Sequence, residues 1–283
     1  MVRNMKFIYA CDIHGDESKY EKLFEQAKKQ NIKYLVLGGD LLPKMCNDRK
    51  LEQTQFIQNY LNEYFTKLKE NDIECICILG NDDLEILDNE FDKMCKAHTN
   101  VFNIDNKRVD IEDISFIGLS KVLDHPFGCK DRVAIENGLK MPMQLSYKIL
   151  IDKCQDKITI DEWEKYREIN IEKMEDTLIN LPKADDKNKT IYVFHNPPYG
   201  IGLDVCADGR QVGSKAMIKF LENSNAYMSL HGHIHESPRM SGLWYNMLGN
   251  TICIQPGQTE LRNKEMFYVI VDTENNSYEN SKE

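Results

Sequence analysis

Residues 230–236, LHGHIHE, place His231, His233 and His235 two positions apart after the apolar run AYMSL. Side chains alternate along an extended segment, so these imidazoles are expected to point to the same side. Imidazole nitrogen is a common metal ligand, but a histidine at such a position can also serve only in packing. The spacing indicates a possible metal site and does not show which of the three histidines take part.

Other apolar, strand-like runs also end in side chains that could bind a metal. The complete set of candidates is Asp12, His14, Asp40, Asn81, His195, His233 and His235. Each has an ordinary alternative, because an Asp can cap a helix and an Asn can lie in a turn. Burying so many polar groups at one sheet edge is costly unless something pairs them. The set therefore favours a shared ligand.

Mixed imidazole and carboxylate donors suit zinc, iron or manganese better than calcium, which prefers oxygen ligands alone. Four protein ligands fill a tetrahedral site. Seven donors, one of them a bridging Asp, are enough for two ions with room for water. The residue types thus predict a dinuclear centre.

An alternation of strands and helices must position these side chains. Near-continuous apolar strands are typical of a sheet covered on both faces, and function gathers at the carboxyl ends of parallel strands. The apolar pattern predicts strands at 6–11, 34–40, 74–83, 101–104, 108–111, 115–120, 190–200, 226–236, 251–257 and 266–271. Helical spacing is found at 17–30, 49–70 and 84–98.

Residues 121–189 carry a weaker pattern and are predicted to be an insertion or cap within a single domain, 1–283. They include one long helix expected over 160–181, which would begin at Thr159 or Asp161 and end before Pro182. The polar tail, 273–283, is expected to be frayed.

The composition limits the functional classes. A net charge of −10 argues against non-specific nucleic-acid binding, which depends on neutralising phosphate charge. No apolar run reaches the roughly 20 residues that span a bilayer, and the first residues lack a signal-peptide pattern, so a cytoplasmic protein is expected. The nine cysteines show no CxxC spacing and are interpreted as small buried apolar residues. A homo-oligomer is possible.

The ordered blocks DIHGD, GGD, GND, H and GHIH resemble the calcineurin-like metallophosphoesterase superfamily, whose blocks read Asp-x-His, Gly-Asp, Gly-Asn-His, His and Gly-His-x-His. FHNPPYGIGLD, VGS and GHIHES are further similar to its small single-domain bacterial and archaeal phosphoesterases. The resemblance implies a four-layer α/β/β/α sandwich of two mixed sheets, here with a partly helical insertion.

The resemblance also implies roles for the matched residues. Asp12, His14 and His235 would bind one metal, Asn81, His195 and His233 would bind the other, and Asp40 would bridge them. His231 would not be a ligand. The expected cofactors are two divalent ions, with Mn²⁺ preferred and Fe or Zn²⁺ as alternatives. The implied reaction is hydrolysis of a small phosphodiester or phosphomonoester through attack by a metal-bridging hydroxide.

One position departs from the family pattern. Asp82 follows Asn81 where active phosphatases usually have a His, and both residues are candidate catalytic residues. An Asp cannot supply positive charge, and a dimetal centre would lower its pKa. This departure favours phosphodiesterase over monoesterase activity. A metal-binding, non-catalytic scaffold is the alternative, and a nuclease fits the charge poorly.

Three residues in 121–189 could contact phosphate or a leaving group. They are His125, Lys130 and Arg132, in the stretch HPFGCKDR. The favoured interpretation is that they are solvated loop residues.

Overall fold

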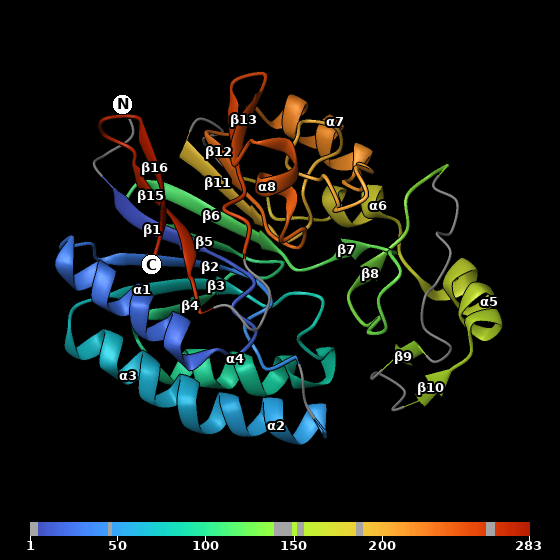
Figure 1. Cartoon of the computed structure of the whole chain (residues 1–283), viewed down its shortest axis with the longest axis horizontal. Helices are drawn as coiled ribbons and strands as arrows, with labels where there is room; N and C mark the ends of the chain where they lie inside the picture. The colour runs from blue at the N-terminus through green and yellow to red at the C-terminus, as the bar shows by residue number, and fades with distance from the viewer. Residues whose placement is uncertain (1–4, 45–46, 139–148, 152–155, 185–188, 259–263) are drawn as a thin grey trace.

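The computed structural model describes residues 5–44, 47–138, 149–151, 156–184, 189–258 and 264–283. Two six-stranded sheets pack face to face with helices outside each of them (Figure 1). The expected four-layer sandwich of mixed sheets is therefore confirmed.

The first sheet has the strand order β16-β15-β1-β2-β3-β4. Strands β1, β2, β3 and β4 are parallel to one another. β15 pairs antiparallel with β1, and β16 pairs antiparallel with β15. The bounds are β1 (Lys6–Ala10), β2 (Tyr34–Gly38), β3 (Glu74–Ile78), β4 (Val101–Asn103), β15 (Phe267–Asp272) and β16 (Ser277–Lys282).

The second sheet has the order β13-β14-β12-β11-β6-β5. The four middle strands are parallel, and the two edge strands are antiparallel to their neighbours. The bounds are β5 (Arg108–Ile111), β6 (Ile114–Leu119), β11 (Thr190–Phe194), β12 (Met228–Leu230), β13 (Tyr245–Leu248) and β14 (Thr251–Ile254).

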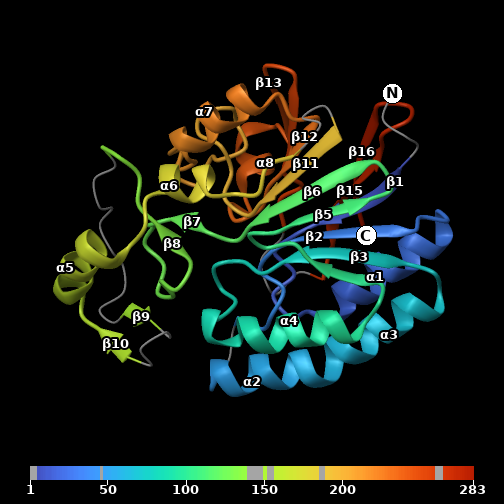
Figure 2. The same cartoon turned by 180° about the vertical axis from the view of Figure 1, so that it is seen from behind.

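Helices cover the outer faces of both sheets (Figures 1 and 2). Those on the first sheet are α1 (Glu17–Lys29), α2 (Arg49–Gln55), α3 (Asn62–Glu70) and α4 (Asp88–Ala97). A π-helical segment, Phe56–Leu61, joins α2 to α3, and a 3₁₀ turn, Glu85–Leu87, precedes α4. Those on the second sheet are α6 (Met174–Ile179), α7 (Lys215–Ser224) and α8 (Ser237–Ser241). No described helix is both long and apolar enough to cross a membrane.

The continuous apolar character of the strands follows from burial on both faces. In β1, Phe7 and Tyr9 join the core between the two sheets, while Ile8 and Ala10 join the core under the helices. This division follows the two-residue period of a strand. The cysteines behave as expected, since the seven that the structure describes are free thiols and six of them are buried.

Two expectations about elements were wrong. The helix expected over 160–181 is two helices, α5 (Ile160–Asn170) and α6, with the start at Thr159 correct because its side chain forms a capping box. The break occurs because Ile135 N–H bonds to Glu172 O, at 3.1 Å, and Met174 N–H bonds to Ile135 O, at 2.7 Å. The tail is also not frayed. It forms β16, whose backbone pairs with β15 over six residues.

The segment 121–189 contains two kinds of structure. The small ladders β7 (Val122–Leu123) with β8 (Val133–Ala134) and β9 (Ile149–Ile151) with β10 (Asp156–Ile158) accompany α5 beside the sandwich (Figure 2). In contrast, α6 packs against α7 in the outer layer. Residues 139–148, 152–155 and 185–188 of this segment lie outside the described residues. A capping role for the part before α6 remains a prediction.

Candidate metal centre

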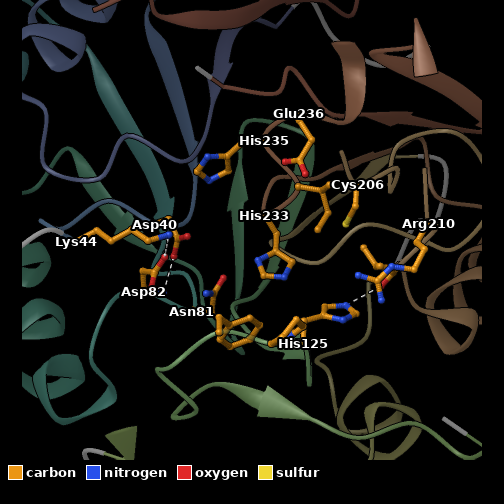
Figure 3. Close-up of a pocket in the computed structure, with 14 residues that line it drawn as sticks. Asp40, Lys44, Asn81, Asp82, His125, Cys206, Arg210, His233, His235 and Glu236 are labelled. Atoms are coloured by element: carbon orange, nitrogen blue, oxygen red, sulfur yellow. Dashed lines mark hydrogen bonds and ion pairs between the residues drawn. The ribbon is translucent and has the colours of Figure 1, made fainter. Parts of the chain in front are cut away.

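The candidate ligands lie at the carboxyl ends of parallel strands in both sheets. Asp12 and His14 follow β1, Asp40 follows β2, and Asn81 follows β3; from the second sheet, His195 follows β11, and His233 and His235 follow β12. The labelled members of this set point toward one hollow (Figure 3). Parallel strands place their carboxyl ends at one edge, so the arrangement is a direct product of the topology.

The backbone turns sharply at four of these residues. Asp12, His14, Asp40 and His233 have φ values of 56°, 51°, 53° and 70°. Non-glycine residues in this left-handed region typically carry a strain of about 1–3 kcal/mol that the surrounding structure must offset. The loops support one another, because Asp12 N–H donates to Gly39 O at 2.9 Å and His14 N–H donates to Asp40 O at 2.8 Å. Such strain is often found at functional sites.

Four of the side chains form a compact cluster. Asp12, His14, Asp40 and His235 each offer a ligand atom, and these atoms lie within 4.8 Å of one another. The Nε2 atoms of His14 and His235 face each other at 3.2 Å, and His235 Nε2 lies 3.3 Å from Asp12 Oδ1. Imidazole nitrogens facing each other beside two carboxylates fit a bound cation, and this donor set suits a divalent transition metal. The cluster is a candidate metal site.

The remaining candidates form a second group that meets the first at Asp40. His195 Nε2 lies 3.4 Å from Asp40 Oδ2 and 3.1 Å from Asn81 Oδ1. His195 Nδ1–H donates to Gly38 O at 2.8 Å, which leaves Nε2 directed into the site. The ring centroid of His233 is 5.5 Å from that of His195. The structure thus brings together all seven residues, arranged as two groups around Asp40.

The carboxylates of the site are held in their charged form. Burial alone would raise the pKa of Asp40, but His195 and His14 outweigh burial and hold this pKa well below its usual range. Burial lowers the pKa of His14 to about 4, whereas Asp40 outweighs burial and raises the pKa of His195 to about 9. Buried negative charge of this kind requires a positive partner. A protonated His195 meets that requirement in the metal-free site, and a divalent cation bound to neutral imidazoles would meet it in the same way.

Close packing leaves no space for a side chain at Gly80. A Cβ there would lie 2.3 Å from both the backbone nitrogen and Oδ1 of Asp40. Gly80 therefore allows the loop after β3, which carries Asn81, to approach the loop that carries Asp40.

The expectation that three aligned imidazoles share one side was wrong. The strand β12 ends at Leu230, and the positive φ of His233 turns the chain out of an extended conformation. His231 is fully buried, and its Nδ1–H donates to Phe194 O at 3.2 Å and Asn196 O at 3.0 Å. It ties the end of β11 to the end of β12 and is not part of the four-residue cluster.

Asp82 is paired with basic residues that the sequence pattern did not single out. Its Oδ2 lies 2.6 Å from Lys44 Nζ, and its Oδ1 lies 3.6 Å from Arg49 Nη1. Its N–H donates to Asp40 Oδ1 at 2.8 Å. The sequence signal for these partners is weak: Lys44 lies in the loop after Asp40, and Arg49 is the first residue of α2.

The expectation of solvated loop residues was wrong for Lys130 and Arg132. Both are buried. Lys130 Nζ lies 2.7 Å from Asp124 Oδ1, and Arg132 Nε donates to Asp83 O at 2.9 Å. A buried charge is costly unless it is paired or hydrogen-bonded within the protein, and these contacts meet that need. Of the three, His125 alone reaches the cavity beside the ligands.

A cavity of about 260 Å³ opens beside the ligands (Figure 3). Its wall is formed by Asp40, Lys44, Asn81, Asp82, His125, Pro126, Phe127, Cys206, Arg210, Val212, His233, Ile234, His235 and Glu236. The His125 and Phe127 rings contact His233, with centroid distances of 5.9 and 5.6 Å. The candidate ligands are thus open to a small molecule on one side.

A two-sheet sandwich with a carboxylate and imidazole centre at its strand ends defines a class of metal-binding hydrolases. Residues 5–237 match the family model described as Calcineurin-like phosphoesterase, so the chain belongs to that family. An uncharacterized protein of Methanocaldococcus jannaschii is 25% identical over 281 residues, covering 98% of this chain and 95% of that protein.

Solved structures show the same fold. A protein of Thermus thermophilus has a TM-score of 0.60 and 17% identity, with 98% of each chain covered. A dimetal phosphatase from Danio rerio has a TM-score of 0.53 and 9% identity, again with 98% of each chain covered. These similarities support the sandwich architecture.

Proposed function

We propose that this protein hydrolyses a small phosphate ester with two divalent metal ions, and that a phosphodiester is preferred over a phosphomonoester. The observation that carries the proposal is the convergence of seven donors from both sheets, four of them within 4.8 Å of one another. Asp12, His14, His235 and Asp40 would hold one ion; Asn81, His195, His233 and Asp40 would hold the other. Mn²⁺ is the proposed metal.

When bound, the two ions would activate a water molecule and neutralise charge on the phosphoryl group. The chain itself contributes placement. Asn81 Oδ1 faces His195 Nε2 at 3.1 Å, so its amide NH₂ is directed elsewhere and can donate to a phosphate oxygen. His195 is oriented by Gly38 O, and Asp40 by the N–H of Asp82. The modest cavity supports a small substrate.

The preference for a diester rests on Asp82. One oxygen of this carboxylate faces Lys44 and the other faces Arg49, so both oxygens are engaged as acceptors. It is therefore a poor proton donor to a leaving oxygen. Aryl esters need that proton least, and an aryl monoester brings one more negative charge toward this carboxylate than an aryl diester does.

The test is a substrate panel. Protein stripped with a chelator and reloaded with Mn²⁺ is assayed on an aryl phosphodiester, an aryl phosphomonoester, cyclic nucleotides and pyrophosphate, with metal analysis of the same samples. We expect Asp40→Ala and His195→Ala to lower the Mn²⁺-dependent diester hydrolysis at least about 100-fold, because each removes a ligand. The half-buried residue His98, at the C-terminal end of α4, supplies the control, and His98→Ala should match the wild type in activity.

Two results would count against the proposal. Most of the activity surviving in both ligand variants would mean that the metal site is not the catalyst. Wild-type protein that binds two metals and cleaves nothing in the panel would favour a non-catalytic, metal-binding scaffold on the same fold.

A further inference from the structure

Three charged side chains meet at the wall of the cavity beside the metal ligands. They are Asp82, Lys44 and Arg49, with one negative and two positive charges. Asp82 is nearly buried, with 7% of its side chain exposed, whereas 35% of the Lys44 side chain is exposed. Lys44 and Asp82 line the cavity (Figure 3). The trio therefore presents a net positive charge to the cavity through Lys44.

A single buried side chain holds both ends of the ion pair. Gln53 Nε2–H donates to Pro43 O, next to Lys44, at 3.0 Å and to Asp82 O at 2.8 Å. Gln53 Oε1 accepts from Leu84 N–H at 3.0 Å, and Gln53 is fully buried. The loop after β2 and the loop after β3 are thus joined at the point where each contributes a charge.

Arg49 adds a second restraint. Its Nη2–H donates to Lys44 O at 3.1 Å, while Nη1 faces Asp82. An exposed ion pair usually contributes little to stability, since solvent screens it and side-chain entropy opposes it. Here the carboxylate is buried, its backbone is pinned and its lysine partner points into a cavity. This arrangement indicates a lysine that is oriented for a ligand.

The position of Lys44 beside the candidate metal-binding residues indicates which kind of molecule it would bind. Lys44 shares the cavity wall with Asp40 and His235, and the backbone N–H of its partner Asp82 donates to Asp40 Oδ1 at 2.8 Å. A positive group beside a metal centre, in a partly enclosed cavity, is suited to an oxyanion. Phosphate oxygens held at the cluster would be within the field of this ammonium group.

We propose that Lys44 binds a phosphoryl oxygen of the substrate and that Asp82 is its positioning residue. This inference rests on the proposed function, because it places the phosphate at the metal cluster. Lys44 supplies from the loop after β2 the positive charge that Asp82 cannot supply from the position where the family has a His. Asp82 acts through Lys44, so its contribution should disappear when Lys44 is absent.

The test measures binding of inorganic phosphate to the Mn²⁺-loaded protein by calorimetry, alongside diester hydrolysis. Lys44→Met should weaken phosphate binding about 10-fold or more and lower kcat/KM by a similar factor, with unchanged metal content. Lys44→Arg should retain part of the binding. Lys50→Met is the matched control, because this exposed lysine on α2 carries the same charge and lies outside the cavity wall.

Asp82→Asn separates a positioning role from a direct one. We expect weaker phosphate binding in Asp82→Asn alone and no additional loss when it is combined with Lys44→Met, because the two residues act as one unit. Phosphate affinity in Lys44→Met equal to that of the wild type, with intact metal content, would overturn the inference. Additive losses in the double variant would overturn the role of Asp82. If the wild type binds phosphate through Lys44 and hydrolyses no ester, the proposed function fails while the binding role stands.

Discussion

Asp83 is a buried carboxylate that joins the loop after β2 to the loop after β3. Its oxygens accept hydrogen bonds from Leu41 N–H at 3.0 Å, Leu42 N–H at 2.8 Å and Gly80 N–H at 2.8 Å. Burial and the nearby charge of Asp40 raise the pKa of Asp83 to about 7. The residue contributes to the site by setting the spacing of two loops that carry Asp40 and Asn81.

Asp83→Asn is expected to lower the free energy of unfolding by about 1–3 kcal/mol, because the new amide NH₂ faces at least one backbone N–H and leaves that donor without an acceptor. Urea unfolding of the metal-free protein measures this loss. Asp72→Asn is the control, since Asp72 is exposed in a turn with a φ of 56° that Asn tolerates. Equal stability of the two variants would show that the three hydrogen bonds are dispensable.

At this scale the sequence identified the candidate ligands and missed the residues that arrange them. Asp40 and Asn81 could be found because each follows an apolar run and a glycine. Asp83 and Lys44 act between loops that are far apart in sequence, and no local pattern records such contacts. The prediction that His231, His233 and His235 point to one side was wrong for a related reason. The left-handed conformation of His233 breaks the alternation of an extended chain.

The helix α5 is attached to the rest of the molecule at Asp124. This buried carboxylate lies 2.7 Å from Lys130 Nζ and 3.1 Å from Arg167 Nε, and it accepts a hydrogen bond from Trp163 Nε1 at 3.1 Å. Trp163 is fully buried and Lys130 also lies over its ring, 5.7 Å from the centroid. Asp124 precedes His125, so the attachment of α5 and the cavity wall share one stretch of backbone.

Trp163→Ala should release α5 while leaving the sandwich folded. Loss of a buried Trp typically costs about 3–5 kcal/mol, which is enough to open a locally attached helix. Limited trypsin digestion should then cleave at Lys165 or Arg167 at least about 10-fold faster, with metal content unchanged. Ile169→Ala, on the same helix and 84% exposed, should behave as the wild type.

Loss of metal binding together with rapid cleavage would contradict this expectation. It would mean that α5 is an integral part of the sandwich and not part of an inserted cap.

The elements themselves were predicted where their pattern depends on local burial. The apolar runs correctly placed β1, β2 and β3, because burial on both faces leaves a continuous signature. The division between α5 and α6 depends on hydrogen bonds to Ile135, and β16 depends on pairing with β15. Partners distant in sequence decide those two features, so helical spacing and polarity alone gave the wrong answer.

For the molecule as a whole, the candidate centre spans the interface between the sheets. Asp12, His14 and Asp40 belong to the first sheet, whereas His195 and His235 belong to the second. Ions bound there would link the two halves of the sandwich. Metal binding should therefore stabilise the complete fold and not only the loops.

Removal of metal is expected to lower the free energy of unfolding. When the free metal concentration is 100 times the Kd, one metal site adds about 2.7 kcal/mol to the free energy of unfolding. Thermal and urea unfolding with EDTA and with Mn²⁺ measure the difference. His235→Ala should show a smaller gain from Mn²⁺, and His98→Ala should show the full gain. A gain that is unchanged in His235→Ala would place the stabilising ion elsewhere.

The crowding of His231, His233 and His235 into five positions has a consequence for folding. In the folded protein His231 bonds to backbone carbonyls, whereas His233 and His235 lie in separate groups of candidate ligands. Both sheets must be in place for this arrangement to form. In the unfolded chain they are close neighbours and can chelate zinc on their own. Premature zinc binding would hold the segment in an arrangement that the native turn at His233 must undo. We therefore expect a correct centre to form more readily when the chain folds before metal is supplied.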